Sequence, residues 1–560
     1  MMPVRDKMIS TKRRFLSVFT FVVLVLVVVV LIIKIDSLLF KSGADQARTK
    51  NDAKFEEIVS YISSYYVDEV NWNDAYLRAT NSILEQLDPH SIYVTASEAE
   101  TNEENFQGQY EGIGIQFDII DSYITVISAI HDSPADKVGL LSGDRIIKIE
   151  GNSVVGIDQS IVPRLLKGKS GTKVHITVMR AGITEPLEFT IIRQSIPIFS
   201  VTDYFMNTDS TGYIYLNRFA KTTVQELDQV LTTLESQGMR RLILDLRWNA
   251  GGLLDEAVKV TSRFLSGHKK IVYTRARVAE FNEEYYADTF GPRKVRDYPL
   301  IILINYASAS AAEIVAGAIQ DYDRGLIVGT TSFGKGLVQR EFPLHDNSRL
   351  RLTISKYYTP SGRLIQKPYK GKNLEQYYDE STDSLALKHT QADSIDTLAL
   401  RSVFYTTGGR KVYSGGGINP DVEIEPATQT YSSALIQQIK DKHLFFEVGS
   451  RFAETHPELK SDPAGFLTGF KVDNQLLVNF TTAASKKGIE INSAELEQYY
   501  HIFTISLKAE IARGLWGDEK YHRVLLEDDN QYRSALHLFS EAEQLLIRIE
   551  NSVSTKDSAR

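Results

Sequence analysis

The chain has 560 residues, a length typical of roughly three to five domains. Its hydrophobic fraction of 43% and its charged fraction of 24% are those of a globular protein that buries a core. The net charge of -8 argues against nucleic acid as the main partner, and the absence of cysteine excludes disulfides and thiolate chemistry.

The N-terminus has the features of a membrane anchor. Residues 15–33 are apolar and uncharged, and three basic residues at 12–14 precede them. At about 1.5 Å per residue this run is roughly 28 Å long as a helix, enough to cross the hydrocarbon core of a bilayer. A cleaved signal peptide is the alternative, but its apolar part is shorter and is followed by an A-x-A-like site. We therefore predict an uncleaved single-pass anchor at 15–34 in the cytoplasmic (inner) membrane, with 1–14 in the cytoplasm and the rest outside, in the periplasm.

Two regions of different character follow the anchor. Residues 35–104 are predicted as a helical N-terminal region, because apolar residues recur at helical spacing from Phe55 until Pro89 ends the pattern. Residues 105–197 consist of short β-rich segments punctuated by Gly, Asp and Ser, with one helical stretch among them. This pattern predicts a compact β-domain.

Residues 198–427 alternate between strand and helix patterns. Strands are predicted at TGYIYLNRF, RRLILDLR, PLIILIN and RGLIVGT, with helices between them. This alternation indicates an α/β layer structure with a largely parallel sheet. Residues 367–413 are polar and rich in Tyr, Asp and Ser, so we interpret them as an insertion. Residues 428–560 are predicted to be a mostly helical C-terminal region.

The corner after the strand PLIILIN holds two serines among alanines, Ser308 and Ser310. Ser310 and Glu313 fit a helix-capping box, in which the serine accepts an amide hydrogen bond and the glutamate reaches back. The same corner also suits a nucleophile, since small neighbours leave the hydroxyl accessible and amides at a helix start can stabilise an oxyanion. The residues alone leave both interpretations open.

A serine nucleophile needs a base. His268 and His345 lie in this region, but in polar turns and outside any catalytic motif. Lys335 lies between two glycines in SFGKG, just past an apolar strand. Its pKa of about 10.4 would have to fall by roughly three units, which costs about 4 kcal/mol and which burial can supply. An exposed loop lysine is the alternative.

A third segment offers backbone amides. In DLRWNAGGLLDEA, Gly251 and Gly252 follow a strand and precede a helix. Backbone amides can approach a ligand closely at such a turn, although glycines there can also serve packing alone.

Together these segments resemble the carboxy-terminal processing peptidases, serine peptidases of family S41 with a Ser/Lys dyad. The matching motifs, in the family's order, are LDPHSIYV, ILDLRWNAGGLLDEAV, NYASASAAEIVAGAIQD, GLIVGTTSFGKGLVQ, LTISKYYTPSGRLIQ and GGGINPDVEIEP. The resemblance covers about residues 55–427. It implies a multidomain α/β protein with a crotonase/ClpP-like α/β protease core, an inserted β-domain, and helical N- and C-terminal regions.

The resemblance also implies residue roles. The family's nucleophile maps onto Ser310 rather than Ser308, and 335 minus 310 gives the family's spacing of 25 residues to the lysine. Lys335 would be the general base and later the acid that protonates the leaving amine. Gln339 matches the position that orients this lysine.

The family's oxyanion hole falls on the backbone amides of Gly251, Gly252 and Ala311. The family usually has RNNPGG at this turn, whereas this chain has RWNAGG. Loss of the proline should loosen the turn slightly, and Trp248 could reshape a substrate subsite. Neither change removes an amide, so activity remains the expectation.

The β-domain resembles a PDZ domain. Gly112, Ile113, Gly114 and Ile115 match the loop whose amides grip a terminal carboxylate, and the strand after it would accept the peptide by β-addition. SPADKVGLLSGDRIIKIEGNSV matches the most recognisable part of bacterial PDZ sequences. Arg180 could sense bound peptide, or be ordinary surface charge.

The resemblance therefore implies a membrane-anchored serine endopeptidase that cleaves exported proteins near their C-terminus. It implies neither a cofactor nor a metal. The expected partners are the C-terminal tails of exported proteins, the membrane through the N-terminal helix, and a second copy or an adaptor lipoprotein through the C-terminal helices. The alternatives are a catalytically inactive PDZ scaffold that binds protein C-termini, and a crotonase-like acyl-CoA enzyme.

Overall fold

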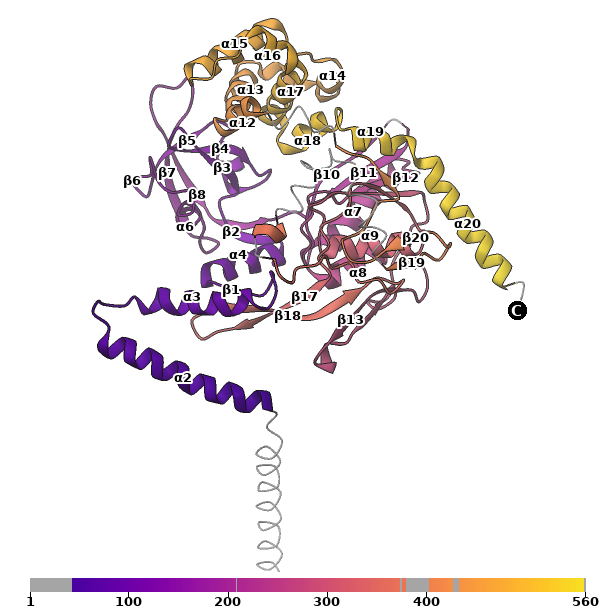
Figure 1. The fold of residues 1–560 in the computed structure, drawn as a ribbon. Coiled ribbons are helices and arrows are strands. Elements are labelled where there is room, and N and C mark those ends of the chain that lie inside the picture. The colour runs from indigo at the N-terminus through magenta and orange to yellow at the C-terminus, as the bar shows by residue number, and fades with distance from the viewer. Residues whose placement is uncertain (1–42, 208, 373–374, 379–401, 427–432, 558–560) are drawn as a thin grey trace, which may run out of the picture. The chain divides into compact units, whose positions relative to one another are not determined.

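The structure, a computed structural model, describes residues 43–207, 209–372, 375–378, 402–426 and 433–557 (Figure 1). The predicted anchor at 15–34 and the predicted cytoplasmic residues 1–14 lie outside this part of the chain. None of the helices within the described ranges is long and apolar enough to cross a membrane. The chain divides into two compact units, with the boundary between Ser82 and Ile83.

The helical pattern of the N-terminal region corresponds to helices α2 (Gly43–Tyr65), α3 (Trp72–Glu85) and α4 (Ala96–Gln107). The start of α4 is a complete capping box, because Thr95 and Glu98 satisfy one another's backbone N–H groups. The chain then enters the β-domain directly, so α4 connects that domain to the segments before it.

The β-domain is built on one antiparallel sheet. Its strands are β3 (Ile115–Ile120), β4 (Tyr123–Ala129), β5 (Arg145–Ile149), β6 (Asn152–Ser153), β7 (Lys173–Met179) and β8 (Leu187–Ile192), with helices α5 (Pro134–Lys137) and α6 (Val162–Leu166). The order is β3-β4-β5-β7-β8, so β3 lies at an edge. In β7, Val174 and Ile176 are buried while His175 between them is exposed, which is the expected period of a half-buried strand. Strands β2 (Gln109–Gly112) and β9 (Gln194–Pro197) pair where the chain enters and leaves the domain.

The predicted parallel sheet is present in the second compact unit. Its strands, in spatial order, are β10 (Val201–Met206), β11 (Thr211–Leu216), β12 (Arg241–Asp245), β15 (Leu300–Ile304), β16 (Leu326–Gly329) and β21 (Val422–Glu423). Every neighbouring pair is parallel except β10 with β11. All five residues of β15 are buried, because a central parallel strand is covered on both faces.

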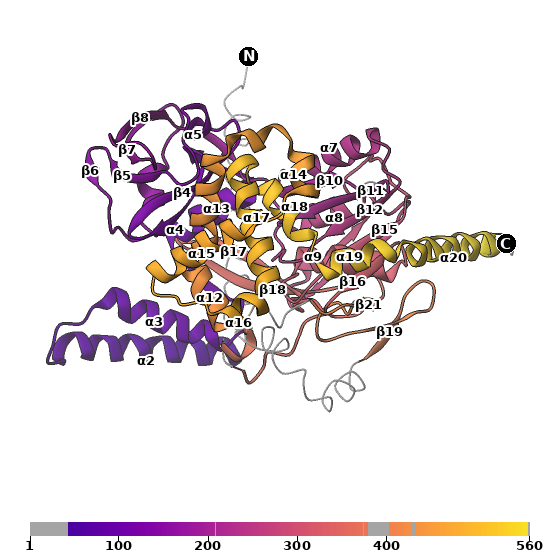
Figure 2. The ribbon, with the colours of Figure 1, turned by 90° about the horizontal axis from the view of Figure 1, so that it is seen from above.

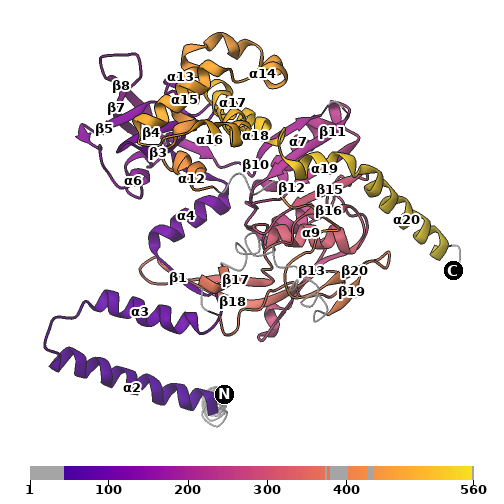
Figure 3. The same ribbon diagram turned by 45° about the horizontal axis from the view of Figure 1, so that its top comes forward.

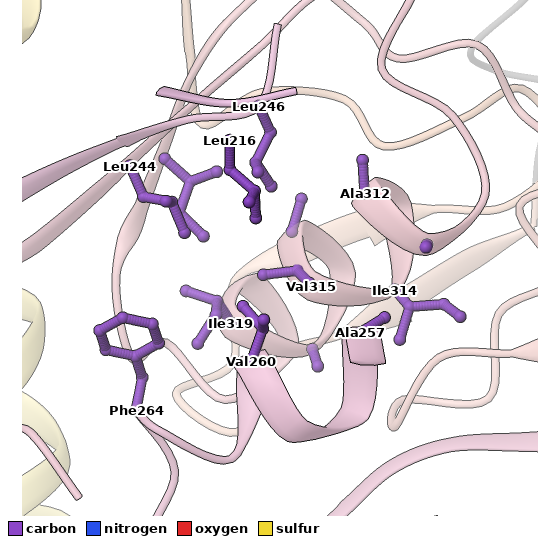
Figure 4. Packing of buried hydrophobic residues seen from close by; sticks show 14 of the residues in the cluster. Leu216, Leu244, Leu246, Ala257, Val260, Phe264, Ala312, Ile314, Val315 and Ile319 are labelled. Atoms are coloured by element: carbon purple, nitrogen blue, oxygen red, sulfur yellow. The ribbon is translucent and has the colours of Figure 1, made fainter. Parts of the chain in front are cut away.

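Helices α7 (Thr223–Ser236), α8 (Leu254–Thr261) and α9 (Ala311–Asp321) accompany this sheet (Figure 2). Figure 4 shows side chains of α9, among them Val315 and Ile319, packed beside Leu244 of β12. Every residue of α9 is buried, and this explains why its sequence consists largely of alanine and β-branched residues. The helix that follows Ser310 is therefore a rigid core element.

The other face of the sheet is covered by C-terminal helices. Ile243, Ile301 and Leu303 point to that face and pack with residues of α19 (Asn530–His537) and α20 (Phe539–Asp557). The C-terminal region, predicted as one helical region, therefore has two parts. Helices α19 and α20 cover the sheet, and the helices before them form a separate helical body.

The helical body has its own hydrophobic core. Its helices are α12 (Ala434–Asp441), α13 (Leu444–Thr455), α14 (Pro463–Gly469), α15 (Asn474–Lys486), α16 (Ser493–Gln498), α17 (Tyr500–Trp516) and α18 (Asp518–Leu526). Phe445, Phe480 and Phe503 stack at its centre. It also contacts the β-domain, where Ser128 Oγ donates to Asp518 Oδ2 at 3.3 Å.

A second, smaller sheet carries the residues around the predicted lysine. It comprises β1 (Ile92–Val94), β13 (Lys270–Ala276), β14 (Glu284–Tyr286), β17 (Leu337–Pro343) and β18 (Arg349–Tyr358) (Figure 3). β18 pairs with β17 along most of its length and with β1 at its start. This pairing brings the LDPHS segment, which immediately precedes β1, to the loop that precedes β17.

The segment predicted as an insertion at 367–413 is partly integrated into the core. Lys367 and Tyr377 are buried, and Lys367 Nζ donates to the Tyr377 carbonyl at 2.8 Å. At the other end, β19 (Val403–Tyr405) pairs with β20 (Lys411–Tyr413). The interpretation of 367–413 as an insertion stays a prediction, since 373–374 and 379–401 lie outside the described residues.

Candidate active site

Ser310 lies at the corner between β15 and α9 in a backbone conformation that few residues adopt. Its φ is 55° and its ψ is -113°, outside the usual regions for a residue with a side chain. Strained residues of this kind persist only where the surrounding structure holds them, and they cluster at functional sites. Small neighbours leave the Ser310 side chain partly exposed.

Ser308 has a different environment from Ser310. It is fully buried, and its hydroxyl donates to the Leu246 carbonyl at 2.8 Å and accepts the Asn305 amide at 2.9 Å. Both bonds hold the backbone of the corner. The Ser308 hydroxyl therefore has a structural role, whereas the role predicted for Ser310 stays a prediction.

The buried carboxylate of Glu313 ties the Ser310 corner to the Lys335 loop. Its Oε2 accepts the amides of Ser310 at 2.8 Å and Lys335 at 2.9 Å. Its Oε1 accepts the Ser332 hydroxyl at 2.5 Å and the Gly334 amide at 2.7 Å. Burial raises the pKa of Glu313 to about 7, while these four donors oppose the shift by stabilising the ionised form.

Tyr357 of β18 joins the same two backbones from the carbonyl side. Its hydroxyl lies 2.5 Å from the Lys335 carbonyl and 3.1 Å from the Ser310 carbonyl, so its one proton serves these two acceptors. Glu313 and Tyr357 thus hold the amides and the carbonyls of Ser310 and Lys335 in a common frame. Sequence reasoning assigned Glu313 to capping only and did not select Tyr357, since nothing in the local pattern marks it.

Lys335 has the electrostatic environment that a neutral amine needs. Burial lowers its pKa to about 8, and the positive charge of Arg351 acts in the same direction. Glu313 and Asp88 oppose this shift. With a pKa of about 8, about a tenth of the lysine is neutral at pH 7. The fall is slightly smaller than the three units that the sequence argument required, and it has the required sign.

The LDPHS segment, residues 87–91, supplies buried polar side chains near Lys335. Asp88 accepts the amides of His90 and Ser91 at 2.9 Å and 3.0 Å, and the Thr353 hydroxyl at 2.9 Å. His90 is buried with its Nε2 3.1 Å from the Tyr377 hydroxyl. Burial lowers the pKa of His90 to about 3, helped by the charge of Lys335, so this imidazole is neutral. The motif was visible in the sequence, but only its position in space reveals this role.

Gln339 contacts Thr353, which is a partner of Asp88. Its Nε2 contacts the Thr353 hydroxyl at 3.4 Å, and Thr353 in turn donates to Asp88. Among the hydrogen bonds of the described residues, none joins Gln339 to Lys335. Its orienting role therefore stays a prediction, to be exerted through Thr353 and Asp88.

The two-glycine turn lies directly against the serine corner. A Cβ at Gly251 would be 2.8 Å from the Ser310 Cβ and 3.0 Å from the Ala311 nitrogen, too close for a side chain. A Cβ at Gly252 would be 2.1 Å from the Phe219 carbonyl oxygen. Both glycines have positive φ, at 99° and 144°. Only glycine fits this close approach.

The three predicted oxyanion amides differ in their hydrogen bonding. Gly251 N–H donates to Asn249 Oδ1 at 2.8 Å. For Gly252 and Ala311, no acceptor of the amide proton occurs among the described residues. Trp248, at the same turn, is 58% exposed with its ring 5.2 Å from that of Tyr306. The turn and the start of α9 thus carry the Gly252 and Ala311 amides, and the exposed Trp248 ring contacts half-buried Tyr306 at the same turn.

The predicted carboxylate loop lies in the β-domain between β2 and the edge strand β3. Ile113 and Gly114 are buried, and Gly114 has a φ of 82°. Arg180 forms an ion pair with Asp144 at 2.7 Å and donates to the Gly139 carbonyl at 2.7 Å. The guanidinium of Arg180 is therefore engaged within its own domain.

Comparison with known families agrees with this division. Residues 210–373 match the model described as peptidase family S41, and residues 112–191 match the model described as PDZ domain. Residues 435–517, in the helical body, match a family of unknown function, DUF8443.

Two curated proteins and one solved structure are similar to the chain. A carboxy-terminal-processing protease of Bartonella bacilliformis is 38% identical over 326 residues, which are 58% of this chain and 74% of that protein. The carboxy-terminal processing protease CtpA of Bacillus subtilis is 33% identical over 439 residues, 77% of this chain and 87% of that protein. A solved photosystem II D1 C-terminal processing protease is 27% identical, with a TM-score of 0.32, and covers 56% of this chain and 83% of its own.

An S41 peptidase core with a PDZ domain ahead of it defines a class of serine protease that processes protein C-termini. Similarity to the curated relatives extends over most of their length. The chain therefore belongs to the carboxy-terminal processing proteases.

Proposed function

We propose that the chain is a membrane-anchored endopeptidase that cleaves exported proteins near their C-terminus with a Ser310/Lys335 dyad. The observation that carries the proposal is the common frame of the two residues. Glu313 accepts both of their amides and Tyr357 reaches both of their carbonyls, although 25 positions separate them. The lowered pKa of Lys335 gives the amine its role as base.

The reaction follows from these groups. The neutral Lys335 amine takes the Ser310 hydroxyl proton while Oγ attacks the scissile carbonyl carbon. The tetrahedral intermediate collapses, the C–N bond breaks, and the lysine ammonium returns the proton to the leaving amine. Water, activated by the same amine, then attacks the acyl-enzyme and releases the shortened protein with Ser310 restored.

The oxyanion of the intermediate would be held by backbone amides. Gly252 and Ala311 carry the two free N–H groups, and the Gly251 amide belongs to the turn through Asn249. Preorganised donors at this position stabilise charge that develops only in the transition state. We therefore assign Gly252 and Ala311 as the main donors, with Gly251 shaping the turn.

Substrate capture would take place in the PDZ domain. The loop from Gly112 to Ile115 would bind the terminal carboxylate, and the tail would pair with the edge strand β3. Capture near a chain end would place the segment before it at Ser310. The alternative is a catalytically inactive PDZ scaffold, and the lowered pKa of Lys335 together with the shared backbone contacts of Ser310 and Lys335 favours the enzyme.

The pH dependence of cleavage tests the lysine directly. Only the neutral amine acts as base, and its pKa is lowered to about 8. We expect kcat/KM to rise about tenfold per pH unit below pH 8 and then to level off. Arg351→Gln removes a positive charge that lowers this pKa, so it should move the rise to higher pH. A profile that is flat from about pH 6 to pH 9 would contradict a lysine base.

The anchor and the substrates can be tested in one host. We expect the full chain to fractionate with the membrane, and a chain lacking 1–34 to be released. C-terminal sequencing of exported proteins should find termini in the wild type that are missing from a Ser310→Ala strain. Identical sets of termini in the two strains would contradict cleavage of exported proteins.

A further inference from the structure

Lys167 lies beside the carboxylate loop of the PDZ domain. It ends α6, where its amide donates to the Pro163 carbonyl at 2.8 Å. The next residue, Gly168, donates its amide to the Glu111 carbonyl at 3.2 Å. A Cβ at Gly112 would lie 3.7 Å from the Lys167 Cα. The backbone of Lys167 is thus packed against the strand that leads into the loop.

In this loop the backbone carbonyls of Ile113 and Gly114 already accept hydrogen bonds. The Ile113 carbonyl accepts the Ala135 amide at 2.9 Å. The Gly114 carbonyl accepts the Ile130 amide and the Ser133 hydroxyl, both at 3.0 Å. Within the described part of the chain, the amides of Ile113 and Gly114 have no backbone acceptor. The loop is therefore oriented to receive an anion.

In this structure the Tyr110 side chain lies at the loop. A Cβ at Gly112 would be 2.8 Å from the Tyr110 Cε2, so the ring packs against that glycine. Burial raises the pKa of Tyr110 to about 12, the charge of Glu104 adds to the rise, and a hydrogen bond from the Gly114 amide opposes it. The Tyr110 hydroxyl therefore occupies the position at the Gly114 amide that an oxygen of a bound carboxylate would take.

The Lys167 ammonium is held at the same place by an internal carboxylate. Its Nζ lies 5.2 Å from the centre of the Tyr110 ring and forms an ion pair with Glu104 of α4. The side chains of Lys167 and Glu104 are 33% and 20% exposed, so the pair is accessible from solvent. Glu104 carries the same charged group as a protein C-terminus.

We propose that Lys167 binds the terminal carboxylate of the captured tail, and that this carboxylate displaces Glu104. The inference rests on the proposed capture of C-terminal tails by the PDZ domain. Charge-assisted hydrogen bonds from an ammonium are stronger than those from amides alone. Lys167 therefore makes the site specific for a free chain end, while an internal peptide segment or an amidated end cannot compete with Glu104.

Capture would also change how the PDZ domain is attached. α4 is held to the peptidase core, since Arg218 donates to Asn105 Oδ1 at 2.8 Å and the Lys221 amide donates to the Phe106 carbonyl at 2.9 Å. The Lys167–Glu104 pair links this helix to α6 of the PDZ domain. A bound terminal carboxylate breaks that ion pair, so tail binding weakens the attachment of α6 to α4.

Peptide binding to the full-length chain tests the proposal. In a Ser310→Ala background, fluorescence anisotropy compares one peptide with an apolar C-terminus as the free acid and as the amide. We expect the acid to bind about tenfold more tightly. Lys167→Gln should remove this preference by weakening the acid alone, and Lys167→Arg should retain most of it. Glu104→Gln should tighten binding of the acid severalfold, because the internal competitor is lost.

The controls distinguish failure of the role proposed for Lys167 from failure of PDZ capture itself. Arg145→Gln removes another PDZ cation, which pairs with Asp121 at 3.2 Å, and should leave both affinities unchanged. Unchanged binding of the amide peptide to Lys167→Gln shows that its groove is folded. A preference for the acid that survives Lys167→Gln overturns the role of Lys167 and leaves PDZ capture standing. Equal binding of acid and amide in the background overturns capture of free C-termini itself.

Discussion

Ser310→Ala should abolish cleavage of a peptide with an apolar C-terminus while the protein remains folded. We expect kcat to fall by at least about 10³-fold, because removal of a nucleophile leaves only binding and oxyanion stabilisation. Ser310 is only partly buried at the corner, and alanine keeps its Cβ. The test measures kcat and the melting temperature of the variant and of the wild type.

A serine-directed covalent probe provides the matched comparison. It should label the wild type and Ser308→Ala, because the Ser308 hydroxyl is buried and bonded to two backbone groups. It should not label Ser310→Ala. An unlabelled wild type would favour the inactive PDZ scaffold, and normal turnover by Ser310→Ala would remove this serine from the mechanism.

The lysine should be equally essential. Lys335→Ala removes the base, and Lys335→Arg keeps the charge but substitutes a guanidinium that does not lose its proton at neutral pH. We expect both variants to lose activity to the same extent as Ser310→Ala. Substantial cleavage by Lys335→Arg would show that the side chain acts as a fixed charge and not as a base.

The second large effect is expected at Glu313, which contacts no substrate. Glu313→Gln keeps the volume but offers one acceptor oxygen in place of two, and its NH₂ group would face backbone donors. Each buried donor left without a partner costs about 1–3 kcal/mol. We expect a loss of at least about 2 kcal/mol in the free energy of unfolding together with a large fall in kcat, measured well below the melting temperature.

Glu510→Gln is the control for Glu313, since it lies in the helical body. Burial raises the pKa of Glu510 to about 7, as it does for Glu313, but its partner is Arg513. It should lower stability without changing kcat. If Glu313→Gln behaved in the same way, with kcat retained, the carboxylate would be a structural group and the common frame would not govern catalysis.

The sequence by itself determined the elements that depend on local pattern. Five consecutive apolar residues predicted the central strand β15, and short β-rich segments between turn residues predicted the β-domain. The motifs around Ser310 and Lys335 predicted the family, which the comparisons confirm. These features depend on residues that are close together in the sequence, so the sequence alone is enough to predict them.

Tertiary structure alone decided which groups serve the site. It buried the Ser308 hydroxyl against backbone groups, and it occupied the Gly251 amide, which the motif had treated like its neighbours. It also enlisted Tyr357, which is 47 positions from Ser310. Asp88 reaches the site through Thr353, which is 265 positions away from it in the chain. Hydrogen-bond partners at such separations are chosen by packing of sheets and helices, and no local periodicity encodes them.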